Sequence, residues 1–91
     1  MPTFEKTLTI VNKLGLHARA ATKLAQLSQQ FDATITLTLA DKSADAHSIM
    51  ALMLLAGGQG KSVTIKTNGK DAEQALNSVY QLINDKFEED E

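Results

Sequence analysis

His17 and Arg19 are the residues whose types and spacing best suit chemistry. Imidazole is nucleophilic and largely unprotonated near neutral pH. Arg19, the only arginine of the chain, carries a permanently charged planar fork that suits phosphate oxygens, and Gly15 permits a close approach of the backbone just upstream. A nucleophile beside an anion-binding group is what transient phosphorylation on histidine requires. The phosphoramidate that results keeps a high transfer potential, so the phosphoryl group can be passed on.

The sequence after His17 predicts a helix from about Ala18 to Gln30. Its apolar positions recur at helical spacing, in the stripe Ala20, Ala21, Leu24, Leu27, Ser28 and Phe31. The amides of Ala18, Arg19 and Ala20 would be unpaired donors of the first helical turn, which favour an anion. A histidine at a helix start is often simply solvated. The glycine, the open amides and the arginine together favour an anion site here.

Ser48 stands before the apolar run Ile49–Leu55 and is expected to cap a second helix. The run Gly57-Gly58-Gln59-Gly60 ends that helix, and it does not start one, so we do not interpret it as a phosphate-binding loop. His47 has no partner pattern. With two histidines and no cysteine, neither a metal site nor a cofactor is expected.

The remaining pattern predicts the fold class. Alternating apolar residues indicate strands over Phe4–Val11, Ala33–Leu39 and Ser62–Thr67, with a turn and a short strand within Asp41–Ala46. Asp71 is expected to cap a long third helix, with Gln74 as its return partner. The apolar stripe of this helix consists of Ala72, Ala75, Leu76, Val79, Leu82 and Ile83, with Phe87 as a candidate at its end. The order β-α-β-β-α-β-α predicts an α+β open-faced β-sandwich, a four-stranded antiparallel sheet covered on one face by three helices. The first helix is expected to connect the first two long strands as a right-handed crossover, so that these strands run parallel. A later strand is expected to insert between them, antiparallel to both.

Length and composition indicate one soluble domain over residues 1–91. The chain is 43% apolar and 22% charged, it has no apolar stretch of about 20 residues, and no basic segment precedes an apolar run at its start. The absence of cysteine fits a reducing cytoplasm. The acidic tail 88–91 holds four of the eleven acidic groups, so residues 1–87 have a small basic excess, too weak to indicate nucleic acid. We interpret the tail as a solubilising end or a minor specificity element.

Two segments of the sequence resemble a known family. Gly15-Leu16-His17-Ala18-Arg19-Ala20-Ala21 resembles the active-site signature of the HPr phosphocarriers of the phosphoenolpyruvate-dependent phosphotransferase system, and Ser48-Ile49-Met50-Ala51-Leu52-Met53 resembles the regulatory-serine helix of that family. The resemblance covers essentially the whole chain. Ala20 is a departure, because many members have proline there. With Asn12-Lys13-Leu14 and the acidic tail, Ala20 makes the chain most similar to the nitrogen-related branch (NPr).

The resemblance implies a phosphocarrier that is not itself an enzyme. His17 would accept a phosphoryl group on Nδ1 from an enzyme I-type protein, ultimately from phosphoenolpyruvate, and pass it to an enzyme IIA-type protein. Arg19 would stabilise the phosphate, and Leu16, Ile49 and Met50 would dock both partners. The chain would act as a monomer, without a membrane or a nucleic acid as partner.

Other interpretations stay open. In some members of the family a dedicated kinase phosphorylates the serine that corresponds to Ser48. For Ser48 of this chain we favour a role as a helix cap alone. The chain could belong to the sugar-transport branch. It could also be a regulatory module of the same fold that acts by docking, or a generic α+β interaction domain without phosphate chemistry.

Overall fold

The computed structural model describes residues 2–55 and 57–89. Along this part of the chain the elements are β1 (Thr3–Thr9), α1 (Ala18–Ser28), β2 (Thr34–Leu39), β3 (Lys42–Asp45), α2 (Ile49–Leu54), β4 (Ser62–Asn68), α3 (Ala72–Asn84) and the short 3-10 turn η1 (Lys86–Glu88). The predicted order is confirmed, and the bounds differ by at most two residues, except that α3 ends at Asn84, before the candidate Phe87. Within these residues, no helix has the length and apolar character needed to cross a membrane.

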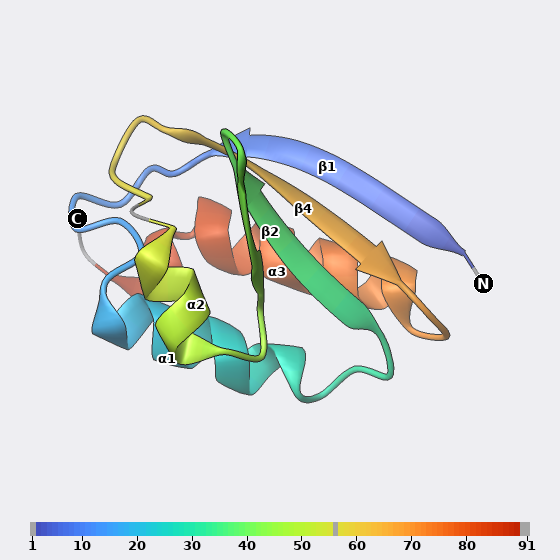
Figure 1. Cartoon of the computed structure of the whole chain (residues 1–91). Coiled ribbons are helices and arrows are strands. Elements are labelled where there is room, and N and C mark those ends of the chain that lie inside the picture. The colour runs from blue at the N-terminus through green and yellow to red at the C-terminus, as the bar shows by residue number, and fades with distance from the viewer. Residues whose placement is uncertain (1, 56, 90–91) are drawn as a thin grey trace.

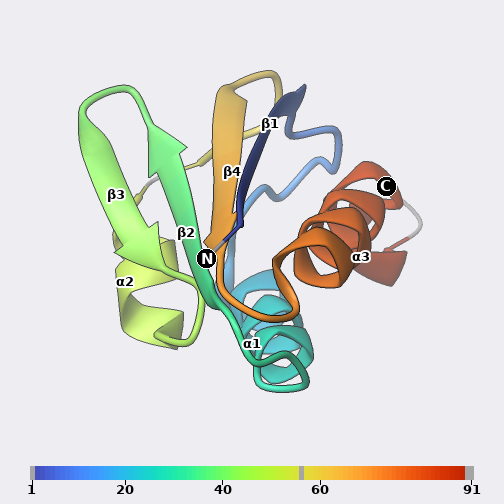
Figure 2. The ribbon, with the colours of Figure 1, turned by 90° about the vertical axis from the view of Figure 1, so that its right-hand side faces the viewer.

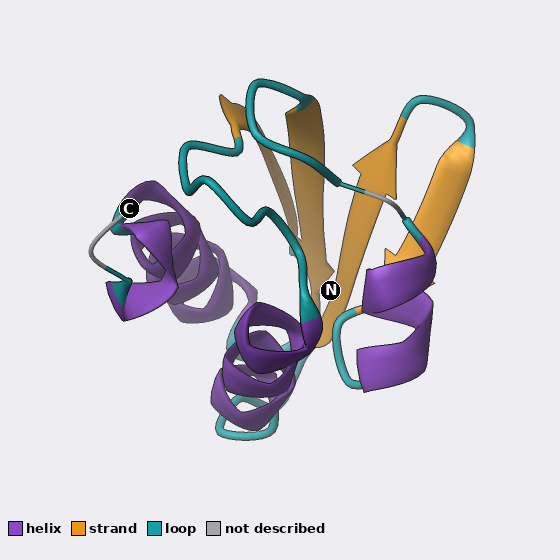
Figure 3. Ribbon diagram, turned by 90° about the vertical axis from the view of Figure 1, so that its left-hand side faces the viewer, coloured by secondary structure: helices purple, strands orange, loops and turns teal. Residues whose placement is uncertain are grey.

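The strands form one sheet in the order β1-β4-β2-β3. Each neighbouring pair is antiparallel, with Leu8 opposite Val63 and Leu37 opposite Ile65. The last strand therefore inserts between the first two, as predicted from the crossover. All three helices lie on the same side of the sheet (Figures 1 and 2). Figure 3 shows the resulting two layers, with the strands on one side and the helices on the other.

The core lies between the sheet and the helices. Alternate residues of β2 and β4 point into it, including Ile35, Leu37 and Ile65, which are fully buried. Period-two alternation puts every second side chain on the covered face, so the polar residues between them remain on the open face. On α1, Ala20 and Ala21 are also fully buried. Their small side chains let the start of α1 approach the core closely, which fixes the direction of the residue before it.

The predicted capping pair at the start of α3 is wrong. Asp71 occupies the N-cap position, but its side chain makes no cap hydrogen bond. Its Oδ2 accepts from the Asp32 amide at 2.8 Å, and the Asp71 amide donates to the Asp32 carbonyl at 3.0 Å. This reciprocal pair ties the start of α3 to the segment before β2. The carboxylate is committed to that contact and is not available to Gln74.

The chain after α3 folds back onto the domain. Lys86, Phe87 and Glu88 all have left-handed backbone angles, with φ of 58°, 54° and 66°. Such angles cost about 1–2 kcal/mol each for residues other than glycine. The side chain of Phe87 is fully buried in the core, and Lys23 donates to its carbonyl at 2.8 Å. These contacts oppose the backbone cost, so Glu88 and Glu89 do not form the free solubilising end that we expected. Asp90 and Glu91 lie outside the described residues.

Candidate functional site

His17 lies where the loop after β1 becomes α1. It is the N-cap residue, with extended backbone angles (φ −79°, ψ 178°), and its side chain makes no cap hydrogen bond. Its carbonyl accepts from the Ala21 amide at 2.9 Å, so the helix begins where the sequence predicts. The imidazole is 25% exposed. The ring is therefore reachable from solvent, and no side chain caps the first helical turn.

The loop that carries His17 is pinned to the loop before β4. The Leu16 amide donates to the Gly57 carbonyl at 2.8 Å, and Figure 1 shows the two loops side by side at one end of the sheet. Gly15 has φ of 63°, and a Cβ there would lie 2.1 Å from the Gly57 oxygen. Only glycine fits both requirements. The glycine that precedes His17 is thus required by backbone shape and by close contact.

The side chain of His17 is bonded to the C-terminal tail. Its Nε2 forms a hydrogen bond with Oε2 of Glu89. The second carboxylate oxygen of Glu89 accepts from Nδ2 of Asn12 at 3.0 Å, and the same Nδ2 donates to the Gly15 carbonyl at 2.9 Å. Asn12 is fully buried. The site is therefore a chain of three side chains, of which sequence reasoning found only the histidine.

The environment of Glu89 keeps its carboxyl ionised near neutral pH. Burial alone would raise the pKa of this group. The hydrogen bonds from Asn12 and His17, and the charges of His17 and Arg19, outweigh that effect and lower the pKa below its usual value. Arg19 is exposed on the first turn of α1. Its guanidinium adds positive charge to the site where an anion is expected.

Comparison with known proteins decides the family. A family model described as "PTS HPr component phosphorylation site" matches residues 4–85. The chain belongs to the HPr family. It is 48% identical over 89 residues to phosphocarrier protein NPr of Shewanella violacea, with 98% of each chain covered. It is 42% identical over 87 residues to phosphocarrier protein HPr of Cupriavidus necator, with 96% of this chain and 98% of that protein covered.

A solved structure of an HPr supports the fold assignment as well. HPr-C-His from Thermoanaerobacter tengcongensis superposes with a TM-score of 0.91 at 38% identity, covering 97% of this chain and 99% of that one. The chain is accordingly an HPr-type phosphocarrier of the phosphotransferase system, and such proteins are carriers that do not act as catalysts. The resemblance to this family inferred from the two sequence segments is confirmed.

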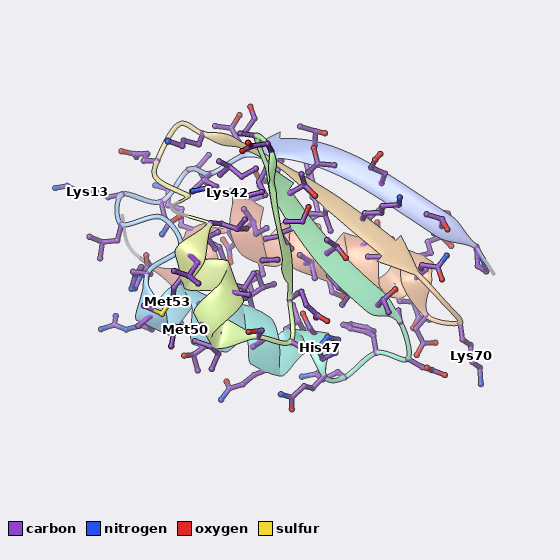
Figure 4. All side chains as sticks on the ribbon, in the orientation of Figure 1. Lys13, Lys42, His47, Met50, Met53 and Lys70 are labelled. Atoms are coloured by element: carbon purple, nitrogen blue, oxygen red, sulfur yellow. The ribbon has the colours of Figure 1, made fainter. Side chains whose placement is uncertain are left out.

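An exposed apolar patch accompanies the site of this HPr-type protein. Its large exposed side chains are Leu14, Ile49, Met50, Met53 and Leu54. Helix α2 packs against α1, and Met50 and Met53 lie where α2 crosses in front of α1 (Figure 4). Ile49 and Met50 are exposed as the docking prediction requires. The sequence analysis did not include the other three in this surface.

Leu16 differs from the expected docking role. Only 6% of it is exposed, and its Cδ1 would lie 3.0 Å from a Cβ placed at Gly57. The residue packs inward because its amide is bonded to the opposite loop, which turns the side chain toward the core. Leu16 therefore supports the loop from beneath and offers little surface to a partner.

Ser48 is the N-cap of α2, as predicted. Its Oγ accepts from the Ala51 amide at 3.2 Å. The following residues expose their apolar side chains on a helix of only six residues. A helix this short depends on its cap and on packing, because isolated short helices are marginal in water.

Replacing the cap should have a small and specific cost. Ser48→Ala removes the acceptor of the Ala51 amide, so the free energy of unfolding should fall by about 1 kcal/mol. Ser48→Asn keeps a capping oxygen and should remain close to wild type. Urea unfolding of the three proteins measures the difference. Equal stability of the alanine and asparagine variants would show that the cap contributes nothing.

His47 has a local partner that the sequence analysis did not foresee. Asp45 Oδ1 lies 3.0 Å from its Nδ1 and accepts from its amide at 2.8 Å. The hydrogen bond from the His47 backbone amide is the main reason why the pKa of Asp45 is lowered. The hydrogen bond to the His47 ring and the charge of that ring lower the pKa further, while burial acts against them. The second histidine is thus part of an exposed surface pair and not of the His17 cluster.

Proposed function

We propose that this protein carries phosphoryl groups on Nδ1 of His17 in the cytoplasm. An enzyme I-type protein would donate the group, drawn from phosphoenolpyruvate, and an enzyme IIA-type protein would accept it. Membership of the HPr family supports the carrier role. The amides of Ala18, Arg19 and Ala20 would hold the phosphate oxygens at the start of α1.

One observation carries this proposal. Nε2 of His17 is bonded to a carboxylate, while Nδ1 has no hydrogen-bond partner among residues 2–55 and 57–89. The helix start beside it has no side-chain cap. A ring nitrogen without a partner, next to open amide donors and an arginine, is suited to receive a phosphoryl group.

The test is incubation with phosphoenolpyruvate and a purified enzyme I-type donor. Intact-protein mass spectrometry should show one added phosphoryl group that is lost in acid and kept in alkali, as a phosphoramidate requires. Peptide mapping should place it on His17. Failure of every enzyme I-type donor to label the protein would contradict the carrier function.

We further infer that the pathway is the nitrogen-related one. The 48% identity to phosphocarrier protein NPr of Shewanella violacea, together with Ala20 at the place where many members have proline, supports this branch. Parallel reactions with the nitrogen-type and sugar-type enzyme I proteins separate the branches. Faster labelling by the sugar-type donor would assign the chain to sugar transport instead.

Arg19→Ala should slow phosphoryl transfer without unfolding the protein. Loss of a charged donor at a site where negative charge accumulates costs about 10²-fold in rate. Arg19 is exposed, so the free energy of unfolding should change by less than about 0.5 kcal/mol. Rapid-quench phosphorylation by enzyme I measures the rate.

Arg19→Lys is the matched variant for that experiment. It keeps the charge but loses the planar fork, so its rate should fall between wild type and Arg19→Ala. An alanine variant that transfers at the wild-type rate would exclude Arg19 from the site.

A second candidate function is regulation by docking. The exposed apolar side chains of α2 support it, because large apolar side chains that gather on a surface often mark a protein-binding site. A pull-down that compares unphosphorylated and phosphorylated protein tests this alternative. Partners that bind both forms equally would favour a module whose action does not depend on phosphate.

A further inference from the structure

We propose that Glu89 is a positioning residue for phosphoryl transfer, which holds the His17 ring in the form that leaves Nδ1 free to accept the phosphoryl group. This inference rests on the proposed carrier function. It assigns to Glu89, and to Asn12 behind it, a part in the reaction of His17.

The contact with Glu89 selects one tautomer of His17. An ionised carboxylate can only accept hydrogen bonds, so Nε2 of the bonded ring must carry the hydrogen. In a neutral imidazole the other nitrogen, Nδ1, then keeps its lone pair. The two ring nitrogens point away from each other, so the carboxylate on Nε2 does not obstruct an approach to Nδ1.

Asn12 holds Glu89 in place. Its Nδ2 donates both to Oε1 of Glu89 and to the Gly15 carbonyl. Both partners are acceptors, so the amide group can only be oriented with its nitrogen toward them. The Oδ1 atom of Asn12 is buried without a partner among the described residues. The two bonds made by Nδ2 therefore fix the orientation of the Asn12 amide and, with it, the position of the Glu89 carboxylate.

The backbone around Glu89 is also fixed in advance. The residue follows the left-handed turn that buries Phe87. Lys23 of α1 donates to the Phe87 carbonyl at 2.8 Å, which ties that turn to the domain. The side chain of Glu89 is itself only 10% exposed. The carboxylate thus reaches His17 from a segment that is already ordered, so little entropy is lost when the contact forms.

The charge on Glu89 matters in the transfer step. The Nδ1 lone pair of His17 forms the new bond to phosphorus, while the bond from phosphorus to the donor histidine breaks and its electron pair returns to the donor ring. The proton on Nε2 of His17 stays in place, so the phosphorylated ring gains positive charge. The carboxylate bonded to Nε2 stabilises that charge as it develops. Its lowered pKa keeps it ionised for this purpose near neutral pH.

Two variants of Glu89 and one neighbouring control test the proposal. Glu89→Ala removes the acceptor, so ¹⁵N NMR should show a loss of the Nε2–H tautomer of neutral His17, and phosphorylation by enzyme I should slow by about 10–100-fold. Glu89→Gln keeps a neutral acceptor, so it should retain much of the tautomer preference while its rate falls by a smaller factor. Glu88→Gln changes the adjacent carboxylate, which is 68% exposed, and should stay within about twofold of wild type.

Both readouts are required for support. An unchanged tautomer ratio in Glu89→Ala would overturn the proposal, and so would a changed ratio with a wild-type rate of phosphorylation. The proposal would also fail if Glu89→Ala were slowed no more than Glu88→Gln. Circular dichroism melting confirms that the variants are folded. The tautomer measurement needs no donor protein. Failure of wild type to be phosphorylated would therefore count against the carrier function, while the NMR result still judges the role of Glu89.

Discussion

His17→Ala is expected to abolish acid-labile phosphorylation, whereas His47→Ala should leave it at the wild-type level. His17 supplies the nucleophile, and no other side chain near the start of α1 can replace an imidazole nitrogen. His47 is exposed and bonded to Asp45, so removing it affects only that surface pair. The two histidines of the chain therefore provide a matched comparison within one protein.

The measurement is label transfer from radioactive phosphoenolpyruvate through a purified enzyme I-type donor. His17→Ala should give no signal after any time of incubation, and His47→Ala should give the wild-type time course. Equal labelling of the two variants would refute His17 as the acceptor. Loss of label in His47→Ala alone would move the acceptor to the second histidine.

Gly15→Ala should disrupt both the fold around the site and its reactivity. The residue would be forced into the left-handed region, and its Cβ would lie 2.1 Å from the Gly57 oxygen and 2.9 Å from the Gly58 Cα. Backbone strain and overpacking together should lower the free energy of unfolding by about 2–5 kcal/mol. The clash also separates the loops that the Leu16–Gly57 hydrogen bond joins, so His17 would be displaced and its phosphorylation slowed.

Gly58→Ala is the control for that experiment. A Cβ at Gly58 meets nothing within 4 Å, and its backbone is not left-handed, so its stability should change by less than about 0.5 kcal/mol. Urea unfolding gives the stabilities, and single-turnover phosphorylation gives the rates. If both alanine variants were equally stable, the tight approach of the two loops would not be a constraint on this site.

Local periodicity was enough to predict the architecture. The alternation through Ile35, Leu37 and Leu39 identified β2, and the helical spacing through Ala20, Ala21 and Leu24 identified α1 with its start after His17. These signals are strong because each element buries one face, and burial dictates the period of its apolar residues. The sheet order followed from the handedness of one crossover. The capping pair at Asp71 failed because its carboxylate found a partner far away in sequence.

The remainder of the site depends on contacts that have no local signature. Glu89 belongs to a run of acidic residues, and composition alone makes such a run typical of a solvated end. Asn12 is polar in a loop, which gives no indication that it is fully buried. Phe87 was the one available signal, since an apolar residue just beyond a helical stripe indicates that the chain still packs on the core there.

The position of β4 has a consequence for the order in which the protein can be made. The elements that pack against β1 are β4 and α3, and the paired residues Thr3 and Asn68 are 65 positions apart. On a ribosome, β1 emerges before β4 and cannot form this pairing until Asn68 has followed. The hydrogen bond between the His17 ring and Glu89 can form only later still, when Glu89 has been added to the chain. A nascent chain therefore cannot assemble its reactive histidine progressively, because the site can form only after Glu89 has been synthesised.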